Sequence, residues 1–269
     1  MGASVRASRD ERATAIEIVR ANSKKKRPSK PCKKEIGTKE YYDEVEAKRY
    51  TAEPHILDFV DFKSWKGKKV LEVGCGLATD GINFARYGAE YSATDLSVES
   101  LNLAKKRFEV YNEKGKFYLG NSEELSSFLP SETYDLIYSF GVIHHSPEPE
   151  KIISEIRKYM HENSVLKIML YASESWKNYM IESGFDQPEA QYGCPIANTY
   201  TKKEVEDLLD GFDVLSIEQN HIFPYKIESY KEGRYEKQPW FESMPSEIFD
   251  VLKKNLGWHL LITAKLKED

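Results

Sequence analysis

The chain of 269 residues has little cysteine and no long apolar run, and each shortage excludes a class of protein. No segment approaches the roughly 18 consecutive apolar residues of a membrane span, and the charged N-terminus lacks the apolar stretch of a secretory signal. The three cysteines show neither CxxC nor Cys/His ligand spacing, so the sequence indicates no disulfide framework and no zinc or other metal site. We therefore expect a soluble protein of the reducing cytoplasm without a membrane partner.

Acidic residues are scarce at one end of the chain. Residues 1–40 carry 12 Lys and Arg against 5 Asp and Glu, whereas the remainder carries 27 against 39. Residues 1–38 also contain few apolar side chains, so we expect a basic mobile arm there, with one helix near residues 9–21. A tail that binds RNA or an anionic surface and a solvated extension both agree with this composition. The absence of interleaved aromatic residues favours the extension.

Residues 70–95 are predicted to form a strand, a glycine turn, a helix and a second strand that ends in an acid, the order of a nucleotide-binding βαβ unit. Gly74 lets the chain turn sharply out of the first strand, and Gly76 has no Cβ to obstruct a ligand against the backbone. Asp95 then stands where a ribose presents its two hydroxyl groups. The alternative is a strand-to-helix turn in a ligand-free α/β protein.

A carboxylate two positions before the first glycine separates two kinds of nucleotide site. The pattern Glu72-x-Gly74-x-Gly76-x-Ala78 resembles motif I of the class I S-adenosylmethionine (SAM) dependent methyltransferases, and the acid at the end of the second strand resembles their ribose-binding residue. The NAD fingerprint fits less well, because its third glycine falls on Thr79. In the methyltransferase pattern that glycine falls on Ala78, a departure of one methyl group.

A second group of motifs follows the fourth predicted strand, residues 134–140. This strand runs into a loop with two adjacent histidines, and a further strand is predicted at residues 165–171. The arrangement looks like motifs IV to VI of the ubiquinone/menaquinone-biosynthesis-like methyltransferases, so the resemblance spans about residues 68–171. It implies SAM as the cofactor and a Rossmann-like, doubly wound α/β sheet of seven strands with an antiparallel last strand.

The resemblance also implies which residues contact the cofactor. Family members commonly have an acid at the position of Asn121, beside the adenine, and there the amide carbonyl and the Ser122 backbone remain available. Residues 39–67 are predicted to form a helical cap across the mouth of the site, where Tyr42 and Arg49 either meet the methionine end of SAM or only pack on the body. The whole predicted set is Tyr42, Arg49, Glu72, Gly74, Cys75, Gly76, Asp95, Leu96, Asn121, Ser122 and Phe140.

The acceptor is expected beyond the carboxyl ends of the strands. We predict a methyltransferase domain at residues 68–269 with two substrate-cap segments, 172–200 and 222–256. The second segment separates the last two predicted strands, and its length exceeds ordinary connections. Of the 33 aromatic residues, 13 fall in residues 171–241, where core packing is the alternative role for most of them.

His144 is our candidate for a general base, because it follows the fourth strand and an imidazole pKa near 6.5 suits proton uptake at neutral pH. The alternative is a structural pair of hydrogen-bonded histidines. Substrate contacts are predicted from His145, Tyr171, Tyr192 and Tyr200.

The sequence therefore predicts a SAM-dependent methyltransferase with a small-molecule acceptor, whose methylated atom stays open among O, N, S and C. One alternative is an RNA or protein methyltransferase that gathers its substrate with the basic arm, although a nucleic-acid partner is not favoured. Another is a SAM-binding interaction protein without transfer activity.

Overall fold

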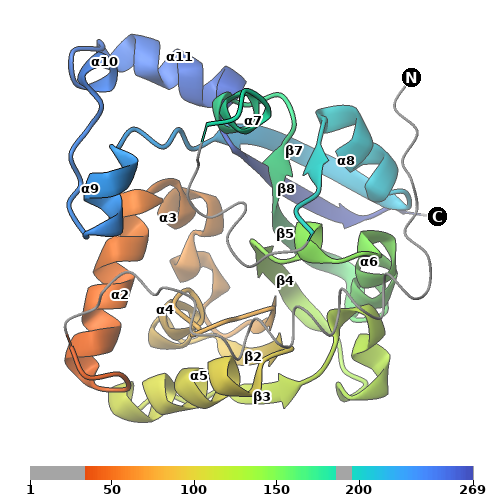
Figure 1. Ribbon diagram of the computed structural model, residues 1–269. Helices are drawn as coiled ribbons and strands as arrows, with labels where there is room; N and C mark the ends of the chain where they lie inside the picture. The colour runs from red at the N-terminus through yellow and green to blue at the C-terminus, as the bar shows by residue number, and fades with distance from the viewer. Residues whose placement is uncertain (1–33, 186–195, 269) are drawn as a thin grey trace.

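The computed structural model describes residues 34–185 and 196–268, in which a sheet lies between two layers of helices (Figure 1). The strands follow the order β3-β2-β1-β4-β5-β8-β7, and β6 pairs with β5 beside this path. Their bounds are β1 Lys69–Val73, β2 Glu90–Asp95, β3 Lys116–Leu119, β4 Tyr134–Phe140, β5 Met160–Ala172, β6 Thr199–Tyr200, β7 Phe212–Asn220 and β8 His259–Leu266.

The strand directions confirm the predicted doubly wound sheet. β1 is parallel to β2 and β4, and the outer pairs β2–β3 and β4–β5 are also parallel. β8 runs antiparallel to both β5 and β7, which confirms the antiparallel last strand. The predicted count of seven strands was too low by one, because the two-residue strand β6 pairs with the end of β5. A two-residue strand is too short to show an alternating pattern in the sequence.

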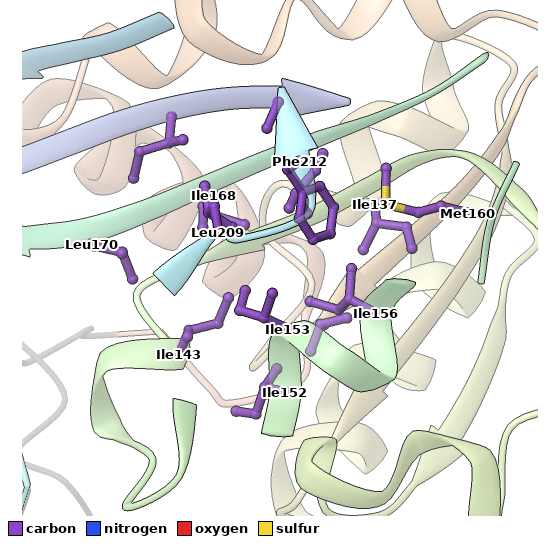
Figure 2. Close-up of a cluster of buried hydrophobic side chains, with 14 of the residues drawn as sticks. Ile137, Ile143, Ile152, Ile153, Ile156, Met160, Ile168, Leu170, Leu209 and Phe212 are labelled. Atoms are coloured by element: carbon purple, nitrogen blue, oxygen red, sulfur yellow. The ribbon is translucent and has the colours of Figure 1, made fainter. Parts of the chain in front are cut away.

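Helices cover both faces of the sheet and complete two separate cores. Because side chains alternate along a strand, Leu71 and Val73 point to one core and Val70 to the other. The first core, drawn in Figure 2, packs the sheet against α6, α8 and η2, and the second packs it against α3, α4, α5 and η1. The bounds of these helices are α3 His55–Val60, η1 Phe62–Trp65, α4 Gly81–Arg86, α5 Val98–Tyr111, η2 Ser122–Ser127, α6 Pro149–Arg157 and α8 Lys202–Leu208.

Two helix starts follow the local signals of the sequence. The Ser97 side chain accepts a hydrogen bond from the Ser100 backbone at the start of α5. Thr201 and Glu204 form a reciprocal capping box at the start of α8. These caps satisfy backbone N–H groups that the first helical turn leaves unpaired, so they fix where each helix begins.

Except for η3, the remaining helices lie at the predicted cap segments. Residues 39–67 contain α2 as well as α3 and η1, and residues 222–256 contain three helices between β7 and β8, of which α11 packs on β7 (Figure 1). Within the described ranges, no helix is both long enough and apolar enough to cross a bilayer. The predicted basic arm falls mostly outside the described residues, as does its helix at residues 9–21. The bounds are α2 Lys39–Ala52, α7 Trp176–Glu182, η3 Ile143–His145, α9 Ile227–Lys231, α10 Pro239–Glu242 and α11 Ser246–Leu256.

Candidate functional site

The glycine turn after β1 lies at the carboxyl end of the parallel strands. The backbone N–H groups of Gly74 and Cys75 donate to the Thr94 carbonyl at 2.9 and 3.0 Å, which ties the turn to β2. Gly74 has φ +79°, and a Cβ there would lie 2.4 Å from the Val142 side chain, so only glycine fits. Gly76 has φ +55°, but a Cβ there would meet no described heavy atom within 4 Å. The turn is therefore packed on one side and open on the side of Gly76.

Asp95 lies beside this open space at the end of β2. Its Oδ2 accepts a hydrogen bond from the Gly76 N–H at 2.7 Å, and its Oδ1 accepts one from the Ser97 N–H at 2.8 Å. Two backbone donors thus fix the carboxylate, which as an ion can accept about four hydrogen bonds. The arrangement fits a ligand with vicinal hydroxyl groups lying against Gly76. Leu96, the next predicted contact, is partly exposed at the same strand end.

The backbone conformation at Ala78 is one that favours glycine, the residue of the methyltransferase pattern at this position. Its φ is +49°, in the left-handed region that L-residues rarely adopt, and its methyl group is completely buried. The alanine is therefore accommodated in a backbone conformation that favours glycine. The substitution retains the course of the turn.

Glu72 lies in the interior behind the turn. The Tyr91 hydroxyl donates a hydrogen bond to its carboxyl group, and α4 comes so close that a Cβ on Gly81 would lie 2.2 Å from that hydroxyl. Burial and, second, the negative charge of Asp80 raise the pKa of Glu72 to about 8. Glu72 is thus mostly protonated at neutral pH unless a cation comes near it.

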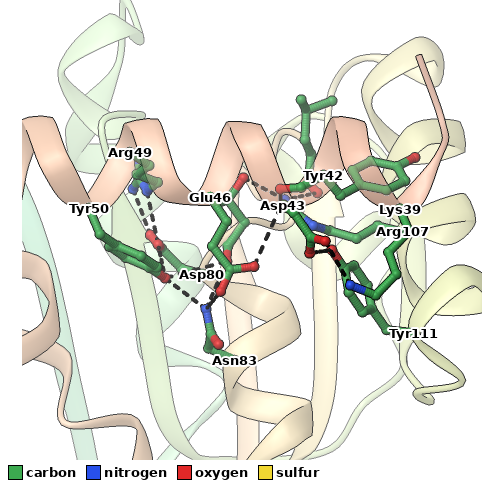
Figure 3. A network of polar contacts seen from close by, with 12 residues as sticks. Lys39, Tyr42, Asp43, Glu46, Arg49, Tyr50, Asp80, Asn83, Arg107 and Tyr111 are labelled. Carbon is green, nitrogen blue, oxygen red and sulfur yellow. Dashed lines mark hydrogen bonds and ion pairs between the residues drawn. The ribbon is translucent and has the colours of Figure 1, made fainter. Parts of the chain in front are cut away.

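Asp80 is a site residue that sequence reasoning missed. It is buried and accepts hydrogen bonds from Arg49 Nε and Nη2 at 2.9 and 2.6 Å, from the Tyr50 hydroxyl at 3.1 Å and from the Tyr138 hydroxyl at 2.8 Å. Burial alone would raise the pKa of Asp80, but the Arg49 charge and these hydrogen bonds lower it below its usual value. Figure 3 shows this network joining α2 to the segment before α4. An acid just before a helix resembles an ordinary cap in the sequence, so no local signal marked it.

Arg49 and Tyr42 come from the same helix but have different surroundings. The Arg49 guanidinium lies 5.1 Å from the centre of the Phe140 ring, at the end of β4, and it also donates to Glu53 at 3.2 Å. Tyr42 is completely buried, and its hydroxyl donates to the Leu103 carbonyl of α5 at 2.8 Å. The structure brings the Arg49 side chain to the strand ends, whereas the Tyr42 side chain packs from α2 onto α5. A cofactor contact for either residue stays a prediction.

Arg107 of α5 clamps the segment that follows the glycine turn. It is fully buried, and its Nη1 donates to the Leu77 carbonyl at 3.1 Å and to the Thr79 hydroxyl at 2.6 Å. Its Nη2 donates to the Tyr42 carbonyl at 2.9 Å. Burial lowers the pKa of Arg107, and the nearby carboxylate of Glu46 partly offsets this change. One side chain thus joins α5, α2 and the loop (Figure 3).

The loop after β3 contains the predicted adenine contacts. The Asn121 side-chain oxygen accepts a hydrogen bond from the Glu123 N–H at 3.1 Å, and Ser122 begins η2. Glu123 is buried and accepts a hydrogen bond from the Ser146 hydroxyl, which connects this loop to the one after β4. Neither Glu123 nor Ser146 was predicted, because their contact spans 23 positions of the chain.

The two histidines of η3 differ in exposure. His144 is completely buried, and within the described ranges neither ring nitrogen has a hydrogen bond. Burial lowers the pKa of His144 well below its usual value, and the neighbouring His145 lowers it further. His145 is partly exposed, and its Nδ1 lies 2.7 Å from the Ile196 carbonyl. In this conformation His144 packs inside the protein, and its role as a base stays a prediction.

The predicted acceptor side is built of stacked rings. The Tyr171 ring centre lies 3.7 Å from that of His144 and 4.2 Å from that of Trp258. Tyr200 of β6 pairs with Ala172, the residue after Tyr171 in β5. Burial raises the pKa of Tyr200. Tyr192 lies outside the described residues. The structure thus brings Tyr171 and both η3 histidines together, whereas the Tyr200 side chain packs against the first core.

Comparisons with known proteins agree with this geometry. A family described as a methyltransferase domain matches residues 64–210. A ubiquinone biosynthesis O-methyltransferase of Photobacterium profundum is 31% identical over 97 residues, which cover 36% of this chain and 41% of the relative. Phosphoethanolamine N-methyltransferase 2 of Caenorhabditis elegans is 22% identical over 222 residues, which cover 78% of this chain and 50% of the relative. The matches thus span half or less of these two relatives.

Solved structures share the fold at low sequence identity. The structure of magnesium protoporphyrin IX methyltransferase from Synechocystis PCC 6803, which contains bound SAM, has a TM-score of 0.57 and 13% identity, with 97% of this chain and 99% of that chain covered. TehB from Haemophilus influenzae has a TM-score of 0.53 and 16% identity, with 78% and 62% covered.

Proposed function

Because this chain belongs to the class I SAM-dependent methyltransferases, we propose that it transfers a methyl group from SAM to a small molecule bound beyond the carboxyl ends of β4 and β5. The observation that carries the proposal is the pairing of Asp95 with Gly76. The backbone-anchored carboxylate and the open space over the glycine together suit the ribose of a nucleoside cofactor. A carboxylate beside a glycine that was packed on all sides would leave no space for a ribose.

SAM, when bound, supplies an activated methyl group for in-line displacement. The residues of this chain then have to hold the acceptor at near-attack distance and exclude water. Asp95 would orient the ribose, and Glu72 would face the cationic amino group after losing its proton. The Arg49 guanidinium, already fixed by Asp80 above the Phe140 ring, would define the boundary between cofactor and acceptor.

The acceptor side favours a small molecule with an apolar or aromatic part. His145 is the more accessible of the two adjacent histidines, and its ring lies against the edge of the aromatic group formed by His144, Tyr171 and Trp258. Because His144 is fully enclosed, it would act as a base only after the η3 loop rearranged, whereas His145 could position an acceptor in the present conformation.

Asp95→Ala tests the proposal. The variant should lose most SAM affinity, by at least about 100-fold, because one side chain holds both the ribose and the Gly76 N–H. Titration calorimetry with SAM and S-adenosylhomocysteine measures the loss. Asp213→Ala, on the exposed surface of β7, is the matched control and should bind normally. Unchanged affinity in a folded Asp95→Ala protein would contradict the proposed cofactor site.

A further inference from the structure

Three of the six histidines of the chain meet at one end of the sheet. His55 begins α3, His221 follows β7 and His259 begins β8, elements that can be followed in Figure 1. All three side chains are largely buried, and the ring nitrogens that they offer lie within 4.8 Å of one another. His55 and His221 are 166 positions apart in the sequence, and His221 and His259 are 38 positions apart. No short motif could therefore predict the cluster.

The spacing of the nitrogens is close to that of a metal site. His55 Nε2 lies 3.0 Å from His259 Nδ1, and in this structure the two nitrogens share a hydrogen bond that a bound ion would replace. Two imidazole nitrogens on a tetrahedral zinc ion, each about 2.05 Å from it, lie about 3.3 Å apart. The ring centres of His221 and His259 are 4.4 Å apart, and the nitrogen that His221 offers lies within 4.8 Å of those of the other two histidines.

The backbone at His221 is held in an unusual conformation. Its φ is +73°, the left-handed region, although the residue is not glycine. Its N–H donates to the Asn220 side chain at 2.7 Å, and its carbonyl accepts from the Trp258 N–H at 2.8 Å. Backbone strain of this kind persists where the surroundings impose it, and it is concentrated at functional sites. Here it places the imidazole against the other two.

A carboxylate stands behind one of the three imidazoles. Glu53 Oε1 lies 3.8 Å from His259 Nε2, the nitrogen opposite to the one that approaches His55. Metal-bound histidines commonly direct their second nitrogen to a carboxylate, which fixes the tautomer and the ring orientation. Glu53 also binds Arg49, whose charge is further compensated by Asp80.

We propose that His55, His221 and His259 bind one divalent transition-metal ion of the zinc type, with Glu53 as the carboxylate behind His259. Imidazole nitrogens suit zinc, copper, iron and nickel, whereas magnesium and calcium prefer oxygen ligands. Three protein ligands are typical of catalytic zinc sites, which keep a fourth position for water or substrate.

A cavity reaches one of the three histidines. His55 lines a cavity of about 230 Å³ between α3 and the strands β5, β7 and β8. Asp58 and Glu218 also line it and would attract a cation, although Lys167 opposes them. On its other side the site adjoins the predicted acceptor region, since the His259 ring centre lies 6.2 Å from that of Tyr171. Metal binding does not depend on methyl transfer and is tested without it.

The experiment uses the full chain without a polyhistidine tag, stripped of metal with a chelator. Titration calorimetry with Zn²⁺ should show that one ion binds per chain. Titration with Co²⁺ should give the visible absorption of a four- or five-coordinate ion. His259→Gln should weaken binding of both ions by more than about 100-fold, beyond the loss caused by removing an outer carboxylate. His161→Gln is the control, because His161 lies outside the cluster, beside Asp135.

His221→Asn is the second ligand variant, because asparagine tolerates the left-handed backbone and so removes the imidazole with the fold retained. It should lose metal affinity as His259→Gln does. Two results would overturn the proposal: a metal-free wild-type chain that binds Zn²⁺ more weakly than about 0.1 mM, or a folded His221→Asn protein that binds it as tightly as the wild type.

Discussion

The two ends of the sheet are held together by different kinds of contact. Around β1, β2 and β4, buried charged side chains connect the elements above a core that itself contains rings such as those of Phe84 and Tyr91: Arg49 pairs with Asp80, and Arg107 binds backbone carbonyl groups (Figure 3). Around β5, β8 and β7, rings dominate, and Tyr171 stacks on Trp258 beside the histidine cluster. The first end holds fixed polar groups, which suits an invariant, charged cofactor. The second end holds apolar faces and largely buried imidazoles, which suits an acceptor chosen by shape.

The difference shows why a family can be assigned here while the acceptor stays open. Polar recognition of a common cofactor requires particular residues at fixed positions, such as Gly76 and Asp95. Ring packing can be built from many combinations of side chains, so it leaves no fixed pattern in the sequence. Variants at the two ends should therefore fail in different ways.

Arg107→Met should have the largest effect on stability. The methionine keeps most of the side-chain volume but leaves the Leu77 carbonyl and the Thr79 hydroxyl without their guanidinium donor, and the Tyr42 carbonyl with its helical partner alone. Two buried or partly buried acceptors left unpaired should lower the free energy of unfolding by about 3 kcal/mol or more. Urea unfolding followed by circular dichroism measures the change.

Lys106→Met is the control for Arg107→Met. Lys106 is adjacent in α5 but exposed, and its ion pair with Glu109 lies on the surface. Loss of this ion pair should lower the free energy of unfolding by less than about 1 kcal/mol. Equal effects in the two variants would mean that the charged end is not organised by Arg107.

Glu72→Gln should change how stability depends on pH. The pKa of Glu72 is raised from 4.5 to about 8 in the fold, so the folded state holds one more proton than the unfolded state between these values. Wild-type stability therefore falls as pH rises through this window, and glutamine removes that fall. Between pH 5 and pH 7 the advantage of the variant should grow by about 2–3 kcal/mol, at about 1.4 kcal/mol per pH unit.

Urea unfolding of the ligand-free protein at both pH values measures the effect of Glu72→Gln. Glu90→Gln, on the exposed start of β2, should show no such trend. A difference between wild type and Glu72→Gln that stays constant from pH 5 to pH 7 would contradict the raised pKa.

The sequence predicted the parallel half of the fold and its turn because those signals are local. The glycines and Asp95 lie within 22 positions, and the caps at Ser97 and Thr201 each involve neighbours three residues away. Asp80 and Arg107 could not be predicted, since their partners come from other elements and are chosen by tertiary packing. Arg107, for example, reaches a carbonyl 65 positions earlier in the chain.

The aromatic half shows the same limit more strongly. Its aromatic content was visible in the sequence, but ring-to-ring pairing depends on how β8 inserts between β5 and β7. That insertion places His259 opposite Tyr171 and Asn220, so residues far apart in sequence become neighbours. The sequence analysis looked for metal ligands only at short spacings along the chain and found none. The fold brings together three histidines that are far apart in the sequence.

Tyr171→Leu should have a smaller stability effect than Arg107→Met and should separate the two ends. The leucine stays apolar but loses the close ring contacts with His144 and Trp258, at about 0.5–1.5 kcal/mol for each aromatic pair. The free energy of unfolding should fall by about 1–2 kcal/mol, while SAM affinity changes by less than about twofold, because the turn and Asp95 are untouched. Tyr179→Leu is the control: Tyr179 is 48% exposed on α7 and should show neither effect. Unfolding curves and SAM titration on the same preparations decide the outcome. If Tyr171→Leu lost SAM affinity as Asp95→Ala does, the rings would be part of the cofactor site, and the division between a polar cofactor end and an aromatic acceptor end would be wrong.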